Sequence, residues 1–287
     1  MTAYEFLTVE RDGKLTIITI NRPAVYNALH PPAHYEFDTA FNQFRDDPDQ
    51  WVAIVTGAGD KAFSAGNDLN FQAEHGPQKR PASGFAGLTH RFDLDKPVIA
   101  AFNGFAMGGG FEIALACDLI IAAQNAIFAL PEPRVGLAAL GGGLHRLPHM
   151  IPRKLAMGMI LTGRRVSAAE GKELGFVNEV VGEGEAVTAA RRWAESILEC
   201  SPLSVRASKQ AVYRGLDSPS LEDAMRTPFP PFRRCAIAQI SSRVPRPLRK
   251  NARRTGRGNN PYSARPLRAM NSGNASSALA PRMTLRA

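Results

Sequence analysis

The chain has 287 residues, of which 44% are hydrophobic and 21% charged, so it is long enough to bury a large core. Its formal charge of +9 comes from one region, because the last acidic residue is Asp223 and the chain from Ala224 onward has 14 Lys or Arg. The first 223 residues have a net charge of −5, which excludes a basic nucleic-acid-binding surface over the body of the protein.

Other features exclude a membrane protein and a metal site. The most apolar stretch, Ile113 to Ala123, contains Asp118 and is far shorter than the roughly 20 residues of a membrane helix. The N-terminus has early acids and no apolar segment typical of a targeting signal. We therefore expect a cytoplasmic protein. The cysteines lack metal-ligand spacing, and the histidines are interpreted as scattered surface or loop residues: Cys117, Cys200, Cys235, His30, His34, His75, His90, His145 and His149.

The first half of the chain predicts alternating strands and helices. Apolar, β-branched runs at 15–20 and 52–56 predict buried strands, with a helix at 32–45 between them. A strand at 98–102 precedes a glycine run and a helix at about 110–117, and two short strands follow at 119–123 and 126–130. Because two strands and a helix recur with a glycine-containing loop each time, we expect an α/β fold.

The second half predicts mainly helices. The helix at 167–174 opens with Ser167 as a capping residue and has Glu170 at capping-box spacing. A last strand is expected at 176–181, and helices at 185–199 and 202–215. These elements predict a core at 1–200 and a C-terminal helical segment at 201–227.

Residues 228–287 form a basic tail. The tail lacks apolar periodicity and is rich in Arg and Pro, a composition that predicts disorder. A shifted reading frame in a GC-rich gene is one hypothesis for its origin, and a genuine basic extension is the other. The tail also leaves open an RNA-binding function through phosphate contacts.

Two local patterns suggest other chemistries and are rejected on their context. Gly57 and Gly59 follow a strand as in a dinucleotide-binding fingerprint, but the next residues are interrupted by Gly66 and do not predict a helix. Ser64 has no G-x-S-x-G context and is interpreted as a small turn residue.

The segment "AMGGGFE" is the most unusual part of the sequence. Three consecutive glycines, which lose much conformational freedom on folding, lead into an apolar helix with Glu112 in its first turn. An acid there complements the helix dipole, so Glu112 alone does not define a site. A second glycine turn occurs in "AFSAGNDL".

Five motifs together resemble one family. The segments "NRPAVYNAL", "AFSAGNDL", "KPVIAAFNGFAMGGGFEIALACDLIIA", "FALPEPRVGL" and "LTGRRVSAAEGKELGFVNEVV" resemble, in order and spacing, the enoyl-CoA hydratase/isomerase or crotonase superfamily. The resemblance covers about residues 5–215. It implies a ClpP-like spiral of β-β-α repeats with a helical C-terminal subdomain, assembled as a homotrimer or hexamer.

The resemblance also implies a site and an activity. The N–H groups of Asn67 and Gly109 would form an oxyanion hole for a thioester oxygen, with glycines allowing close approach of the backbone. Glu112 would activate water and Glu132 would protonate the α-carbon. The activity implied is enoyl-CoA hydration, with CoA entering as part of the substrate and no cofactor or metal; the alternatives are a Δ3,Δ2-enoyl-CoA isomerase and a crotonobetainyl-CoA hydratase.

Further substrate contacts are implied in two segments, through Ala24, Val25, Tyr26, Ala65, Gly66, Asp68 and Leu69. Candidates for the acyl pocket, chosen by their position in expected loops, are Phe71, Leu88, Phe92, Leu137 and Leu140.

Overall fold

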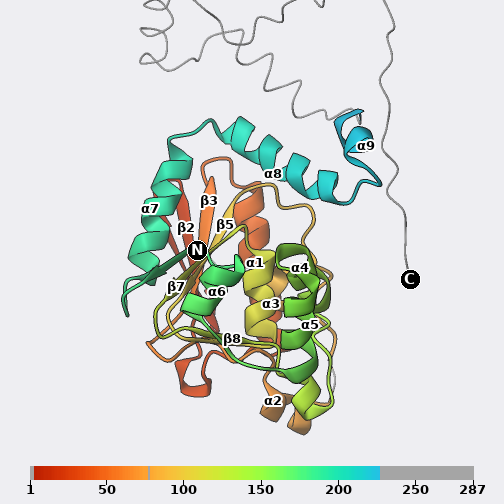
Figure 1. Cartoon of the computed structure of the whole chain (residues 1–287). Helices are drawn as coiled ribbons and strands as arrows, with labels where there is room; N and C mark the ends of the chain where they lie inside the picture. The colour runs from red at the N-terminus through yellow and green to blue at the C-terminus, as the bar shows by residue number, and fades with distance from the viewer. Residues whose placement is uncertain (1–2, 77, 227–287) are drawn as a thin grey trace, which may run out of the picture. The chain divides into compact units, whose positions relative to one another are not determined.

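The computed structural model describes residues 3–76 and 78–226, and two β-sheets form the frame of this part (Figure 1). Within these residues the larger sheet has six strands in the order β1-β2-β3-β5-β7-β10. Strand β1 is antiparallel to β2, and the other neighbouring pairs are parallel. The strands are β1 (Leu7–Asp12), β2 (Leu15–Ile20), β3 (Val52–Gly57), β5 (Val98–Phe102), β7 (Leu119–Ala123) and β10 (Glu179–Val181).

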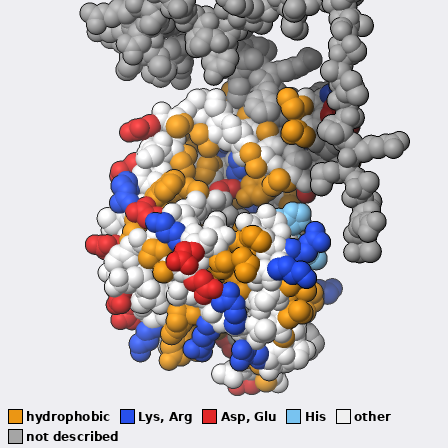
Figure 2. All heavy atoms as spheres, in the orientation of Figure 1, with side chains coloured by type: hydrophobic (Ala, Val, Ile, Leu, Met, Phe, Trp, Pro, Cys, Tyr) orange, Lys and Arg blue, Asp and Glu red, His pale blue; other side chains and the backbone are white. Residues whose placement is uncertain are grey.

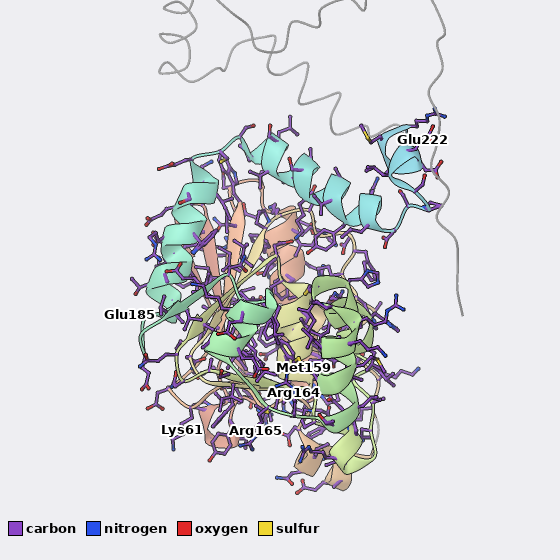
Figure 3. The ribbon with its side chains drawn as sticks, viewed as in Figure 1. Lys61, Met159, Arg164, Arg165, Glu185 and Glu222 are labelled. Carbon is purple, nitrogen blue, oxygen red and sulfur yellow. The ribbon has the colours of Figure 1, made fainter. Side chains whose placement is uncertain are left out.

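The smaller sheet has four described strands in the order β4-β6-β8-β9: β4 (Ala62–Ser64), β6 (Phe105–Met107), β8 (Ile127–Ala129) and β9 (Val166–Ser167). Each of the pairs β3/β4, β5/β6 and β7/β8 places its first strand in the larger sheet and its second in the smaller one. Helices follow the first two pairs, so the predicted strand-strand-helix repeat is confirmed. Figure 3 labels Lys61, just before β4, and Arg165, just before β9, at the lower end of the described body.

The helices cover both faces of the larger sheet. They are α1 (Pro31–Asp46), α2 (Leu69–His75), α3 (Gly109–Ala116), α4 (Gly143–Met150), α5 (Arg153–Thr162), α6 (Ala168–Leu174), α7 (Ala186–Leu198), α8 (Pro202–Leu216) and α9 (Leu221–Arg226). Because side chains alternate along a strand, Ile54 packs with Ala190 of α7, while Val55 belongs to the core that contains Phe37 of α1 and Phe111 of α3. The sheet is therefore buried between two hydrophobic layers.

Helix α8 is joined to the body by polar contacts. The Asp118 carboxylate accepts hydrogen bonds from Lys209 at 2.7 Å and Tyr213 at 3.1 Å. Figure 2 shows hydrophobic side chains near α8 and α9 on the surface of this view. Val212 and Leu216 of α8 are 61% and 66% exposed, so this helix keeps an apolar face on the surface of the described chain.

Most predicted elements are confirmed, and one boundary is wrong. The helices at 32–45 and 167–174 form, and Ser167 accepts the Glu170 N–H at 3.2 Å as the capping residue. The strand predicted at 176–181 begins only at Glu179. The N–H groups of Phe176 and Val177 instead bond to the Gly171 carbonyl at the end of α6, and both side chains enter the core.

The interpretation of the histidines is wrong for two of them. His30 is the N-cap of α1, and His34 lies inside that helix; both are buried, with His34 fully so. The rejection of the dinucleotide fingerprint is consistent with the structure, because strand β4 follows the glycines where the fingerprint requires a helix. Ser64 is the last residue of β4 rather than a turn residue.

Some predictions are not tested. The domain boundaries at 200 and 227 stay predictions, and the basic tail at 228–287 lies outside the described residues. Among the described residues, no helix combines the length and apolarity that crossing a membrane requires, and no group of three or more His, Cys, Asp or Glu could hold a metal ion.

Asn27 joins the first loop of the fold to the second sheet. Its amide donates to the carbonyls of Ala58 at 3.0 Å and Ala62 at 2.7 Å, and its Oδ1 accepts the Arg22 N–H at 3.0 Å. Its backbone has a φ of +57°, a conformation that asparagine tolerates better than alanine. Asn27 therefore fixes the loop against β4 through both its side chain and its backbone.

We expect Asn27→Ala to lower the free energy of unfolding by about 3 kcal/mol, because three largely buried hydrogen bonds are lost at about 1 kcal/mol each. Urea denaturation of the two proteins measures the difference. Asn21→Ala, at an exposed position, is the matched control and should change stability by less than about 0.5 kcal/mol. A loss as small as the control's would show that Asn27 does not hold the loop.

Candidate active site

Two loops meet between the sheets, one after β4 and one before α3. Gly66 has a φ of +86°, and a Cβ placed on it would lie 2.5 Å from the Met107 carbonyl oxygen and 2.9 Å from the Gly109 nitrogen. Only glycine permits so close an approach of two backbones. Asn67 follows Gly66, so the structure brings the predicted oxyanion-hole residues Asn67 and Gly109 together.

The Asn67 N–H is not used by the neighbouring bridge. Leu29 and Asn67 form a parallel bridge in which the Leu29 N–H bonds to Gly66 and the Asp68 N–H bonds to the Leu29 carbonyl, both within 2.9 Å. Gly109 is the first residue of α3, where a backbone N–H has no partner in its own helix. Two N–H groups at the meeting point of the loops are therefore available to an acceptor.

The glycines at 108 and 109 both lie against side chains of the site itself. A Cβ on Gly108, which has a φ of +54°, would lie 2.8 Å from Oε1 of Glu132. A Cβ on Gly109 would lie 2.5 Å from the ring of Phe85, which is buried. The sequence suggested that the glycines admit a thioester; the structure adds a separate reason, because the space is already filled by a carboxylate and a ring.

Gly110 is required by the close approach of β4. A Cβ there would lie 2.2 Å from the Ser64 carbonyl oxygen. Ser64 also joins the loop that contains Asn27 to the loop after β4, since its hydroxyl donates to the Asn27 carbonyl at 2.8 Å and accepts the Gly66 N–H at 3.1 Å. This serine is therefore a support of the candidate oxyanion hole.

Glu112 is buried in the first turn of α3, with 4% of its surface exposed. Its Oε1 accepts the Gly143 N–H at 2.9 Å, at the start of α4. The pKa of its carboxyl group is raised, because the effect of burial exceeds that of the backbone hydrogen bonds from Gly141 and Gly143 and of the charges of Arg80 and Arg146, which lower it. The carboxylate is thus held in place by the α4 turn.

Glu132 is partly buried and differs from Glu112 in its hydrogen bonds. It begins a 3-10 helix, η3 (Glu132–Val135), between Pro131 and Pro133, and its buried Oε2 has no hydrogen-bond partner among the described residues. Burial raises the pKa of Glu132 to about 7, and the nearby charge of Glu112 acts in the same direction. A carboxyl group with this pKa can hold or give up a proton near neutral pH.

The two carboxyl groups therefore differ in what they can do. Glu112 is fixed as an acceptor beside a helix N-terminus, whereas Oε2 of Glu132 has no partner among the described residues and its carboxyl group can hold a proton near neutral pH. Pairs of titratable groups in contrasting environments are typical of acid and base partners. This pair lies next to the two N–H groups, because Glu112 is three residues from Gly109 and the Glu132 carboxyl group occupies the space where a Cβ of residue 108 would lie.

The predicted substrate-binding segments also come together. Ala24 and Val25 lie in the 3-10 helix η1 (Pro23–Val25), and the Ala65 N–H bonds to the Tyr26 carbonyl at 2.9 Å. Val25 and Tyr26 are 39% and 51% exposed, so both can contact a ligand. Ala65 is exposed as well.

Asp68 and Leu69 are placed differently from one another. Asp68 is largely buried, accepts the Phe71 N–H at 3.1 Å as the N-cap of α2, and pairs with Arg22 at 2.8 Å. Its side chain therefore supports the loop and is not free for a ligand. Leu69, the first residue of α2, is 49% exposed.

Of the acyl-pocket candidates, Leu88 is wrong as a loop residue facing a ligand, because it is buried in the core. Phe71 lies in α2 and packs edge-on against His30, with ring centroids 4.8 Å apart. The other three candidates, Phe92, Leu137 and Leu140, are 88%, 50% and 75% exposed.

Sequence patterns missed four residues around the site. Phe85 lies in the 3-10 helix η2 (Phe85–Gly87) beneath Gly109, and His34 contacts its ring at 4.4 Å. Arg80 donates to Oδ1 of Asn67 at 3.1 Å, and Arg146 donates to the Thr89 carbonyl at 2.7 Å beside the turn that holds Glu112. They come from segments without a motif, so only tertiary structure reveals them.

The fold is an α/β fold of the crotonase type. Its paired strands bring two backbone N–H groups and two inward-facing glutamates to one place. The family model described as enoyl-CoA hydratase/isomerase matches residues 10–228, and the chain belongs to this family. The resemblance and the fold predicted from the sequence are confirmed.

Individual relatives support the same conclusion. Carnitinyl-CoA dehydratase of Salmonella enteritidis PT4 is 46% identical over 224 residues, which are 77% of this chain and 85% of that protein. A carnitinyl-CoA dehydratase structure from Mycobacterium avium 104 is 41% identical, with a TM-score of 0.72 over 78% of this chain and 90% of that one. An enoyl-CoA hydratase structure from Mycobacterium tuberculosis H37Rv is 39% identical, with a TM-score of 0.75 over 84% and 98%.

The raised pKa of Glu132 predicts a pH-dependent cost to stability. Because the folded state binds this proton more tightly than the unfolded chain, wild-type protein loses stability as pH rises from about 4.5 to about 7. Glu132→Gln cannot ionise. Relative to wild type, its free energy of unfolding should rise by about 2 kcal/mol between pH 4 and pH 8, less than the full shift would give because the group is partly exposed to solvent.

Urea denaturation at both pH values tests this, with exposed Glu173→Gln as the control for the change in net charge. A difference between Glu132→Gln and wild type that stays constant with pH would show that Glu132 titrates as it does in the unfolded chain.

Proposed function

We propose that the chain is an enoyl-CoA hydratase, a hydro-lyase that catalyses reversible syn addition of water to a 2-trans-enoyl-CoA thioester. The observation that carries this proposal is the pair of glutamates in contrasting environments beside the two N–H groups. The family and the relatives named as hydratases and dehydratases support it.

In the proposed reaction the thioester oxygen accepts hydrogen bonds from the N–H groups of Asn67 and Gly109, which stabilise the charge of the enolate-like intermediate. The N-terminus of α3 adds its positive end to the same oxygen. Glu112 orients water and takes its proton as the oxygen bonds to the β-carbon, and Glu132 gives its proton to the α-carbon. The pKa of about 7 at Glu132 suits a group that must be protonated before the step and ionised after it.

CoA enters as part of the substrate, and we propose no metal or separate cofactor. Exposed Val25 and Tyr26, with Ala65 and Leu69, would contact the pantetheine and adenine parts. We also propose a homotrimer or hexamer in the cytoplasm, for which the exposed apolar side chains of α8 provide a surface.

A second candidate is hydration of crotonobetainyl-CoA, the reverse of carnitinyl-CoA dehydration. It is favoured by relatives of that name at 46% and 41% identity. An isomerase, the other alternative, is less favoured because shifting a double bond does not need two carboxyl groups with separate roles.

We expect Glu132→Gln to bind enoyl-CoA and to hydrate it at least about a hundredfold more slowly, since the proton donor is removed. Glu112→Gln should give a loss of the same order through the loss of the base. Hydration of crotonyl-CoA is followed by its absorbance, and binding by calorimetry. Exposed Glu173→Gln should keep wild-type turnover; turnover close to wild type in both active-site variants would exclude the hydratase mechanism.

The contact between Gly109 and Phe85 makes a separate prediction. Gly109→Ala should lower kcat at least about tenfold, because its Cβ meets the Phe85 ring and displaces the N–H donor. The double variant Gly109→Ala with Phe85→Leu should recover part of this loss, since the smaller side chain leaves room for the Cβ.

Phe85→Leu alone is the control for the lost ring. If the double variant is no more active than Gly109→Ala, the ring is not what sets the position of the N–H group.

A further inference from the structure

Arg80 lies beside the proposed acyl site. Its guanidinium donates to Oδ1 of Asn67 at 3.1 Å and lies over the ring of Phe85, 5.2 Å from the centroid. Its charge also acts on Glu112, whose pKa it lowers. These three residues hold the thioester oxygen, support Gly109 and activate water, so the guanidinium lies close to the acyl carbons.

The charge of Arg80 is not neutralised. Among the described residues no carboxylate lies within ion-pair distance of it, whereas Arg22 pairs with Asp68 at 2.8 Å and Arg91 pairs with Asp38 at 2.6 Å. The residue is exposed, and its hydrogen bond to Asn67 leaves other N–H groups of the guanidinium available. An anion in the acyl site could therefore reach it.

His34, which packs against the same Phe85 ring, adds a second hydrogen-bond donor. Its Nδ1 accepts the Ala86 N–H at 3.1 Å, so the proton of the neutral imidazole is on Nε2. This Nε2 is buried and has no hydrogen-bond partner among the described residues. Arg80 and His34, which both lie against the Phe85 ring, offer hydrogen-bond donors and carry no negative charge.

We propose that this enzyme selects acyl groups carrying a carboxylate beyond the β-carbon and discriminates against those carrying a cation, with Arg80 as the selecting residue. The inference rests on the proposed hydratase function. The two glutamates serve any substrate of the reaction, so the discrimination comes from the unpaired guanidinium. It separates this chain from what the relatives' names indicate, because a carnitinyl group carries a trimethylammonium cation.

Three thioesters substituted at the same carbon test the proposal: glutaconyl-CoA with a carboxylate, crotonobetainyl-CoA with a cation, and 5,5-dimethylhex-2-enoyl-CoA with a neutral group of the cation's shape. We expect kcat/KM of the wild-type enzyme to be at least about tenfold higher for the carboxylate than for the cation, with the neutral ester between them. Arg80→Gln should remove most of this difference, and Arg80→Glu should reverse it.

Crotonyl-CoA reports the reaction without either charge, so each kcat/KM is divided by the value that the same variant gives with crotonyl-CoA, which separates a general loss of activity from a loss of preference. Arg165→Gln, an exposed arginine at the lower end of the body in Figure 3, is the matched control and should keep the wild-type preference. A wild-type enzyme that prefers crotonobetainyl-CoA, or a preference unchanged in Arg80→Gln, would overturn the proposal.

Failure of the proposed function would be recognised separately. If none of the thioesters is hydrated, the hydratase assignment is wrong, and calorimetric Kd values for the same esters then decide the selectivity. Tighter binding of glutaconyl-CoA than of crotonobetainyl-CoA, lost in Arg80→Gln, would support selection by Arg80; equal binding would overturn it.

Discussion

The close contact between two backbone loops is the constraint on which the rest of the site depends. Gly66 lies against the Met107 carbonyl and the Gly109 nitrogen, and Gly110 lies against the Ser64 carbonyl, at distances that no Cβ could share. Because β4 and β6 are neighbours in the smaller sheet, the loops that follow them leave the same edge together. Two N–H groups from distant parts of the sequence thus share one space, an arrangement in which electrostatic stabilisation needs little reorganisation.

The glutamates depend on the same contact for their different properties. Glu112 is carried by the helix that begins at the contact, so its position and its hydrogen bond to Gly143 are fixed by packing. Glu132 belongs to a short segment after β8, and its carboxyl group fills the space beside Gly108, with no partner for Oε2 in the part of the chain that the structure describes. The raised pKa of Glu132 comes from its burial and from the nearby charge of Glu112, and a side chain at position 108 would displace the carboxyl group from this place.

The fold and the segment with the glycine run and Glu112 could be predicted from the sequence, because short local patterns of residues indicate both. The strand at 98–102, the glycine run and Glu112 occupy one continuous segment, and Ser167 identifies its helix through a capping pattern. The predicted strand at 176–181 is too long at its start. Phe176 and Val177 are apolar, and a short apolar run looks the same in a sequence whether it pairs in a sheet or packs in the core. Tertiary contact decides between these outcomes.

The residues proposed to select the acyl group are not part of the sequence motifs that contain the proposed catalytic residues. Arg80 lies in a loop and His34 on the buried side of α1, and no sequence motif contains either residue. Both side chains lie against the ring of Phe85. The unpaired charge of Arg80 is likewise a property of its surroundings, since a sequence does not show which acids lie near it. Similarity over 77% of the chain therefore establishes the family, while the proposed preference among acyl groups rests on side chains outside its motifs.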